Sequence, residues 1–179
     1  MVILITGDTH TGKTLLAQSL LEKYKYPYLS IDHLKMGLIR SGQSNLSADS
    51  NGTDLTNYLW PIIREIIKTN IENAQNIIVE GCYVPFGWEK DFSTGYLQEI
   101  KYICLIFSRK YIENHFCDML RFENLIENRL STDLIAEELI KTNEYNLEQC
   151  VLRNYNHILI DNNYPIDLDS ITVSGWLPG

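Results

Sequence analysis

The feature that most constrains this fold lies at the start of the chain, where a glycine-bracketed octapeptide directly follows a short apolar run. The octapeptide, residues 7–14 (GDTHTGKT), matches the pattern G-x-x-x-x-G-K-[ST] in full. The run before it, residues 2–6 (VILIT), predicts a buried strand, and residues 13–24 carry apolar side chains at helical spacing. A strand, a glycine-bearing turn and a helix in this order are the context that a phosphate-binding loop requires.

Phosphate binding accounts for the residue types of this octapeptide. Glycine lets the chain curl tightly, so several backbone N–H groups can point at the same phosphate oxygens. The helix that follows directs its free amides and the positive end of its dipole at the same place. Lys13 is expected to reach the β- and γ-phosphates of ATP, and the Thr14 hydroxyl to complete the coordination of Mg²⁺; GTP stays open as the alternative donor. The expected nucleotide-binding positions are Gly7, Asp8, Thr9, His10, Thr11, Gly12, Lys13, Thr14 and the next in line, Leu15.

The rest of the chain alternates between short runs of Ile, Val and Leu and longer segments with helical spacing, which is typical of a parallel sheet with crossover helices. Further strands are expected at residues 28–31, 76–80, 102–107 and 157–160. Helices are expected at 32–40, at 55–75 with Pro61 near its first turns, and within 110–153, and loops at 41–54 and 81–96. The sequence therefore predicts one α/β domain over residues 1–179, a three-layer sandwich of a five-stranded parallel sheet with helices on both faces.

The charge balance argues against a nucleic-acid partner. Lys and Arg total 15 against 23 Asp and Glu, a net charge of -8, so a nucleic-acid backbone would repel the chain.

No stretch approaches the roughly 18 apolar residues of a membrane span. The four cysteines form no Cys-x-x-Cys pair, as expected of free thiols in a reducing compartment. We expect a cytoplasmic protein that acts on a small-molecule phosphate acceptor, without a nucleic-acid or membrane partner, and monomer and dimer both stay open.

With this octapeptide at its start, the sequence resembles the small P-loop kinases of the nucleoside monophosphate kinase-like superfamily, which include adenylate kinase, shikimate kinase, chloramphenicol phosphotransferase and the zeta-toxin kinases. The resemblance also rests on LSIDHLKMGLIR after the second strand, on IIVEG as the third strand, and on an Arg-bearing segment at about 110–135. Only the octapeptide is specific by itself. The resemblance implies a P-loop NTP hydrolase fold, with a small helical lid at about 110–135.

In the members of this superfamily that phosphorylate hydroxyl groups, an Asp at the end of the second strand contacts the acceptor hydroxyl, and Asp32 matches that position. An Arg about two turns later binds an anionic group of the acceptor, and Arg40 matches it. The two residues are eight apart, so both can lie on one face of the helix. Two alternatives stay open: Asp32 as a helix N-cap, and Arg40 as a solvated helix end.

The end of the third strand carries a further candidate. By the resemblance, Glu80 holds Mg²⁺ through a water and contributes to the acceptor site, although Asp is more usual there. Glu80 could instead solvate the sheet edge. Tyr83, Phe86 and Trp88 follow at the carboxyl side of the sheet, where such sheets bind ligands. They are candidates for lining the acceptor pocket, Tyr83 above all, or for packing the loop on itself.

Arginines in the lid-like segment are candidates for clamping the phosphoryl group. Arg121 and Arg129 are eight apart on one predicted face, and the resemblance makes them catalytic lid residues that supply positive charge to the transition state. Glu123 and Glu127 offer the alternative of ordinary surface pairing. Arg153 is a weaker candidate of the same kind.

The favoured function is an ATP-dependent phosphotransferase that moves the γ-phosphate to a small-molecule acceptor. A hydroxyl acceptor benefits from a base, which Asp32 could supply, whereas a nucleoside monophosphate, the first alternative, needs none. A nucleotide-binding switch would need a guanine-reading Asn-Lys-x-Asp after a late strand, and residues 157–167 contain no Lys. A zeta-toxin-like kinase of an activated sugar is the remaining alternative, which a tightly bound antitoxin would reveal.

Overall fold

The computed structural model describes residues 1–122 and 135–162, with the side chains of residues 121 and 122 excepted. The strands are β1 (Val2–Gly7), β2 (Tyr28–Ser30), β3 (Ile77–Glu80), β4 (Ile100–Phe107) and β5 (His157–Ile160). The helices are α1 (Lys13–Tyr24), α2 (Ile31–Arg40), α3 (Gly52–Glu72), α4 (Thr94–Gln98), α5 (Arg109–Phe122) and α6 (Ala136–Arg153), with a short 3₁₀ helix, η1 (Trp88–Asp91).

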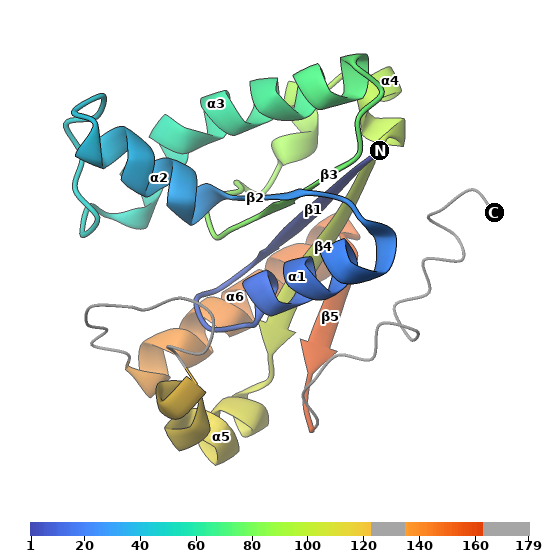
Figure 1. Ribbon diagram of the computed structural model, residues 1–179. Coiled ribbons are helices and arrows are strands. Elements are labelled where there is room, and N and C mark those ends of the chain that lie inside the picture. The colour runs from blue at the N-terminus through green and yellow to red at the C-terminus, as the bar shows by residue number, and fades with distance from the viewer. Residues whose placement is uncertain (123–134, 163–179) are drawn as a thin grey trace.

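The five strands form one sheet in the order β2-β3-β1-β4-β5, and every neighbouring pair is parallel (Figure 1). The chain passes from β1 outward to β2 on one side, and later to β4 on the other side. A ligand site in such a sheet is expected where the strand order reverses, at the carboxyl ends of the strands. This point lies at the end of β1, whose last residue, Gly7, is the first residue of the octapeptide. The predicted five-stranded parallel sheet is confirmed.

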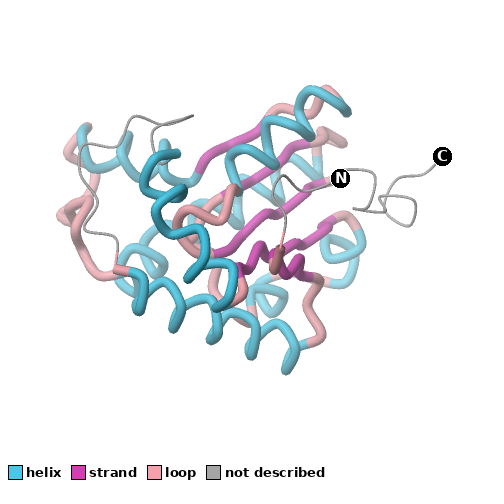
Figure 2. The backbone as a smooth tube through the Cα atoms, turned by 90° about the horizontal axis from the view of Figure 1, so that it is seen from below, coloured by secondary structure: helices cyan, strands magenta, loops and turns pink. Residues whose placement is uncertain are grey.

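Alternation along the central strand assigns the helices to the two faces of the sheet. In β1, Val2 and Leu4 pack in a cluster with α3, whereas Ile3 and Ile5 pack in a second cluster with α1. Each of these four side chains is at most 3% exposed, as expected of a central parallel strand with both faces covered. Figure 2 shows the strands as a layer between helices. Within the described residues, no helix is both long and apolar enough to span a bilayer.

Helix α3 differs from the sequence prediction at its start. It begins at Gly52, three residues early, because the Asn51 side chain caps it by accepting a hydrogen bond from the Asp54 backbone N–H at 2.9 Å. Pro61 is therefore in the helix interior, where its missing N–H leaves one helical hydrogen bond unmade. The helix persists because a stripe of large side chains is buried against the sheet: Leu55, Leu59, Trp60, Ile63 and Ile67.

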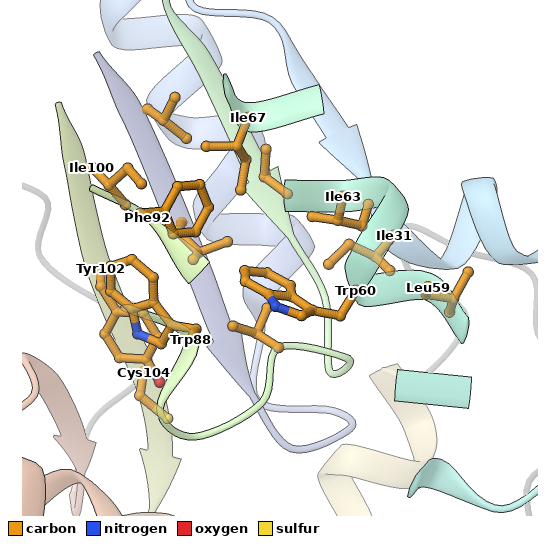
Figure 3. Packing of buried hydrophobic residues seen from close by; sticks show 14 of the residues in the cluster. Ile31, Leu59, Trp60, Ile63, Ile67, Trp88, Phe92, Ile100, Tyr102 and Cys104 are labelled. Carbon is orange, nitrogen blue, oxygen red and sulfur yellow. The ribbon is translucent and has the colours of Figure 1, made fainter. Parts of the chain in front are cut away.

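The segment 81–96 is not the open loop that its composition suggests, since it contains η1 and the start of α4. Trp88 is 6% exposed and stacks on Tyr102 of β4, with ring centroids 5.5 Å apart (Figure 3). Phe86 stacks on Tyr155, with ring centroids 6.5 Å apart. The packing alternative is therefore correct for Phe86 and Trp88, and Tyr83 is the aromatic that remains for an acceptor site.

Candidate active site

The octapeptide turns tightly at the end of β1, and its two glycines have conformations that other residues rarely adopt. Gly7 has φ +138°, and a Cβ on it would lie 2.3 Å from the carbonyl oxygen of Leu105 on the adjacent strand. Gly12 has φ +82° and stands directly before α1. His10, between them, has φ +63°. The loop therefore curls back over the end of β1, with the amino end of α1 beside it, as phosphate binding requires.

Gly7→Ala is expected to lower the free energy of unfolding by more than about 2 kcal/mol, because the new methyl meets backbone and the φ value is strained. Urea denaturation measures the loss. Gly37→Ala is the matched control: among the described residues, a Cβ there would meet nothing within 4 Å outside its own helix backbone, and Ala inside a helix is favoured over Gly by roughly 0.5–1 kcal/mol. A Gly7→Ala protein as stable as the wild type would contradict this account of the turn.

Lys13, the first residue of α1, places its ammonium inside the loop. Its Nζ donates to the backbone carbonyl oxygen of Asp8 at 2.7 Å, and the residue is only 7% exposed. Burial alone would lower the pKa of this ammonium, but nearby Cys82 and Glu80 raise it above its ordinary value. Lys13 therefore stays charged at neutral pH, and it offers a fixed positive charge at the place where phosphate would lie.

Asp8 connects the loop to α6 through a residue that the sequence analysis missed. Its carboxylate accepts hydrogen bonds from the backbone N–H of Thr9 at 2.7 Å and from Nδ2 of Asn143 at 3.3 Å. Asn143 is 1% exposed, and its side chain also accepts from the backbone N–H of Phe107 at 2.8 Å. A polar residue within the buried stripe of α6 is the signal that could have identified Asn143, because buried amides need partners.

Burial raises the pKa of the Asp8 carboxyl to about 6, against an ordinary value of 3.8. The folded state thus binds this proton more tightly than the unfolded state, so stability is lost as the pH rises from about 4 through 6. Asp8→Asn removes the titration. Relative to the wild type, its free energy of unfolding is expected to increase by about 1–3 kcal/mol between pH 4 and pH 7.5, at about 1.4 kcal/mol per pKa unit. Urea denaturation at each pH measures this, and parallel pH profiles would contradict it.

Asp32 lies at the start of α2, but it is not the N-cap. Ser30 occupies the cap position, and its side chain makes no capping hydrogen bond. Oδ1 of Asp32 instead accepts from Nζ of Lys35 at 2.7 Å, and the same Nζ donates to the hydroxyl of Tyr83 at 2.9 Å. The N-cap alternative for Asp32 is wrong. Lys35 is a second residue that the sequence analysis missed, although its spacing of three from Asp32 on a helix is a detectable signal.

Asp32 and Glu80 both act on Lys13 through their charge, because each raises the pKa of its ammonium. Glu80 pairs with Ile5 of β1 and Ser30 of β2 at the carboxyl end of β3 and is 1% exposed. The alternative of a solvated sheet edge is therefore wrong for Glu80. The loop lysine is therefore within electrostatic range of two carboxylates, one at the end of β3 and one in the first turn of α2.

The oxygen ligands available here suit Mg²⁺. Thr14 is the second residue of α1 and offers a hydroxyl, and Glu80 offers a carboxylate. Among the described residues, no group of three or more His, Cys, Asp and Glu side chains forms a metal site on its own. An ion bound here would complete its coordination with phosphate oxygens and water, which is how proteins usually hold Mg²⁺. The metal roles of Thr14 and Glu80 stay predictions.

The remaining candidates are four arginines and Leu15. Arg40 is exposed at the end of α2. The side chain of Arg121 and the whole of Arg129 lie outside the described residues, as do residues 123–134 of the predicted lid. Arg153 ends α6 shortly before the start of β5, so it lies near the amino ends of the strands, whereas the octapeptide lies at their carboxyl ends. Leu15 has an apolar side chain, so only its backbone could contact phosphate.

No family model matches the chain, and comparison with curated proteins yields no match. Solved structures do resemble it. A protein from Chloroflexus aurantiacus, provisionally described as a kinase, has a TM-score of 0.58 at 16% identity, over 98% of this chain and 96% of its own. Shikimate kinase from Acinetobacter baumannii in complex with shikimate gives 0.56 at 14% identity, over 98% and 92%. A sugar kinase from Janibacter sp. HTCC2649 gives 0.55 at 12% identity, over 92% and 86%. At these identities the likeness shows the fold, which is that of the small P-loop kinases.

Proposed function

We propose that the chain is a kinase that transfers the γ-phosphate of ATP to a hydroxyl group of a small molecule. The observation that supports this most directly is the placement of Asp32 within electrostatic range of Lys13, at the carboxyl edge of the sheet. Lys13 is buried in a loop built to hold phosphate, and Asp32 is a carboxylate on the adjacent helix. A phosphate-binding cation and a carboxylate that can accept a proton are two groups that such a transfer requires.

In this proposal each residue has one role. The backbone amides of the loop and Lys13 hold the phosphates and stabilise the negative charge of the transferring group. Thr14 and Glu80 hold Mg²⁺, which supplies further charge neutralisation at the phosphate oxygens when bound. Asp32 accepts the proton of the acceptor hydroxyl as its oxygen bonds to the γ-phosphorus, and the bond to the bridging oxygen breaks to release ADP.

A hydroxyl acceptor is favoured over a nucleoside monophosphate because Asp32 is not used as a helix cap. Its Oδ1 accepts a hydrogen bond from Lys35, and its second oxygen could accept a proton from a hydroxyl, which a phosphate acceptor does not need. The structural relatives include a shikimate kinase bound to shikimate and a sugar kinase, which is consistent with this class of acceptor. The net charge of -8 supports a small molecule rather than a nucleic acid as the acceptor. The free thiols support a cytoplasmic location.

An ATP-consumption screen with Mg²⁺ tests the proposal. The acceptors are hydroxy acids, sugars, nucleotide sugars, small alcohols and nucleoside monophosphates, each run in parallel with a catalytically disabled variant to remove background. Turnover with a hydroxyl compound and transfer of label from γ-labelled ATP to it would support the proposal. Turnover with nucleoside monophosphates alone would overturn it in favour of the monophosphate kinase, and nucleotide binding without any turnover would favour the switch.

A further inference from the structure

Lys35 is held beside Asp32 more firmly than a surface lysine. Its side chain is 11% exposed, whereas that of its partner Asp32 is 33% exposed. Nζ donates to Oδ1 of Asp32 and to the hydroxyl of Tyr83, and it also lies 5.0 Å from the centroid of the Tyr83 ring. Burial would lower the pKa of this ammonium, but Asp32 and Tyr83 raise it above its ordinary value. Lys35 is therefore charged, and its position is determined by three contacts.

These contacts join two separate parts of the candidate acceptor site. Lys35 and Asp32 belong to α2, whereas Tyr83 follows β3, 48 positions further along the chain. Tyr83 comes three residues after Glu80. The hydrogen bonds of Lys35 therefore form a bridge from α2 to the segment that follows the end of β3, where the second carboxylate lies. An exposed lysine–carboxylate pair within one helix contributes little to stability. Stability of such a pair would not require the additional contacts between Lys35 and Tyr83.

The bridge leaves one oxygen of Asp32 available. Oδ1 is engaged by Lys35, and Oδ2 has no hydrogen-bond partner among the described residues. The bond to Oδ1 restricts rotation of the carboxylate, so Oδ2 is presented in a defined direction. A base acts efficiently only when its proton-accepting atom is held within hydrogen-bond reach of the reacting hydroxyl.

We propose that Lys35, anchored by Tyr83, is a positioning residue that holds Asp32 through Oδ1 and directs Oδ2 at the acceptor hydroxyl. The inference rests on the proposed function, in which Asp32 accepts the proton of that hydroxyl. Lys35 does not touch the reacting atoms. Its contribution lies in the orientation of the base, so it affects the chemical step and not the binding of either substrate.

Lys35→Gln is expected to lower kcat by about 10- to 100-fold, with less than about 3-fold change in KM for ATP or for the acceptor found in the screen. Lys35→Arg, which keeps the charge and the donor, should recover most of kcat. Tyr83→Phe removes the anchor and keeps the ring, so a smaller loss of about 3- to 10-fold is expected. Equal losses with Lys35→Gln and Lys35→Arg, or a loss confined to KM, would overturn the inference.

Lys68→Gln is the matched control, because Lys68 also pairs three residues away with a carboxylate, Glu65, and lies over an aromatic ring, Phe92. It belongs to α3, outside the candidate site, so kcat should stay at the wild-type value. Urea denaturation of both lysine variants shows whether the protein still folds. If Lys35→Gln proved no more damaging to kcat than Lys68→Gln, the positioning role would be refuted.

A double-mutant cycle separates this inference from the proposed function. In an Asp32→Asn background, Lys35→Gln should cause no further loss of kcat, because a positioning residue has nothing left to orient. If Asp32→Asn lowers kcat, and Lys35→Gln then lowers it further by the same factor as in the wild-type background, the inference would be overturned and the proposed function would not, since Lys35 would then act on substrate directly. A wild-type kcat in Asp32→Asn itself would overturn the proposed function, and the inference with it.

Discussion

Asp32→Asn is expected to lower kcat by about 10²–10⁴, with nucleotide affinity almost unchanged. The amide keeps the size of the side chain and an oxygen that can accept the hydrogen bond from Lys35, but it cannot take a proton. Steady-state kinetics with the acceptor found in the screen gives kcat and both KM values, and calorimetry gives the affinity for the nucleotide. Because Ser30 and not Asp32 occupies the cap position of α2, only a small change in stability is expected.

Asp54→Asn provides the control for this change. Asp54 lies in the first turn of α3, as Asp32 lies in the first turn of α2, and it accepts a hydrogen bond from a nearby side chain, Nδ2 of Asn51. It is exposed and lies outside the candidate site, so its kcat should match that of the wild type. An unchanged kcat in Asp32→Asn would remove the hydroxyl acceptor from the proposal and favour the nucleoside monophosphate kinase. Joint loss of nucleotide binding and activity would indicate a folding or metal role for Asp32.

Lys13→Ala is expected to lower kcat by about 10²–10³, or roughly 3–4 kcal/mol of transition-state stabilisation, the size typical of one preorganised charge. The structure places the Lys13 ammonium inside the loop, held by the Asp8 carbonyl, so the charge is in place before the substrate arrives. The fold is expected to survive because the core clusters do not include this side chain. Circular dichroism and kinetics at saturating ATP measure both effects.

Lys23→Ala serves as the control for Lys13→Ala, because Lys23 is exposed in the last turn of the same helix, α1. Its activity should equal that of the wild type. Lys13→Met, which keeps much of the length of the side chain, shows whether any loss reflects the missing charge rather than an empty space. Full activity in a folded Lys13→Ala protein would show that the octapeptide does not handle the phosphate donor.

The errors of the sequence prediction have identifiable causes. Proline favours the first turn of a helix, which predicts Pro61 near a helix start, but burial of the nearby Trp60 and Ile63 outweighs the one lost hydrogen bond. Asp32 follows a strand, as an N-cap often does, yet the helix begins one residue earlier, at Ile31, whose fully buried side chain packs in the core. In both cases tertiary packing decided against a local preference.

The sequence by itself determined the features that depend on near neighbours. Residues 2–24 contain a strand, a glycine turn and a helix in one continuous stretch, so the phosphate loop follows from local spacing and from the φ values that only glycine adopts readily. The regular alternation of apolar runs and helical segments likewise sufficed for the five-stranded parallel sheet. Glu80 and Asp32 could be proposed as site residues because the ends of strands can be recognised from the pattern of apolar residues.

Only the tertiary structure decided which distant side chains meet. Lys35 and Tyr83 are 48 positions apart, and Asp8 and Asn143 are 135 apart, and nothing in local spacing relates either pair. The strand order brings β2 and β3 together at one edge of the site, and the packing of α6 against β4 brings Asn143 to the loop. A lysine on a helix has many conformations in the isolated segment, and its direction is set only when burial and a partner from another element select one.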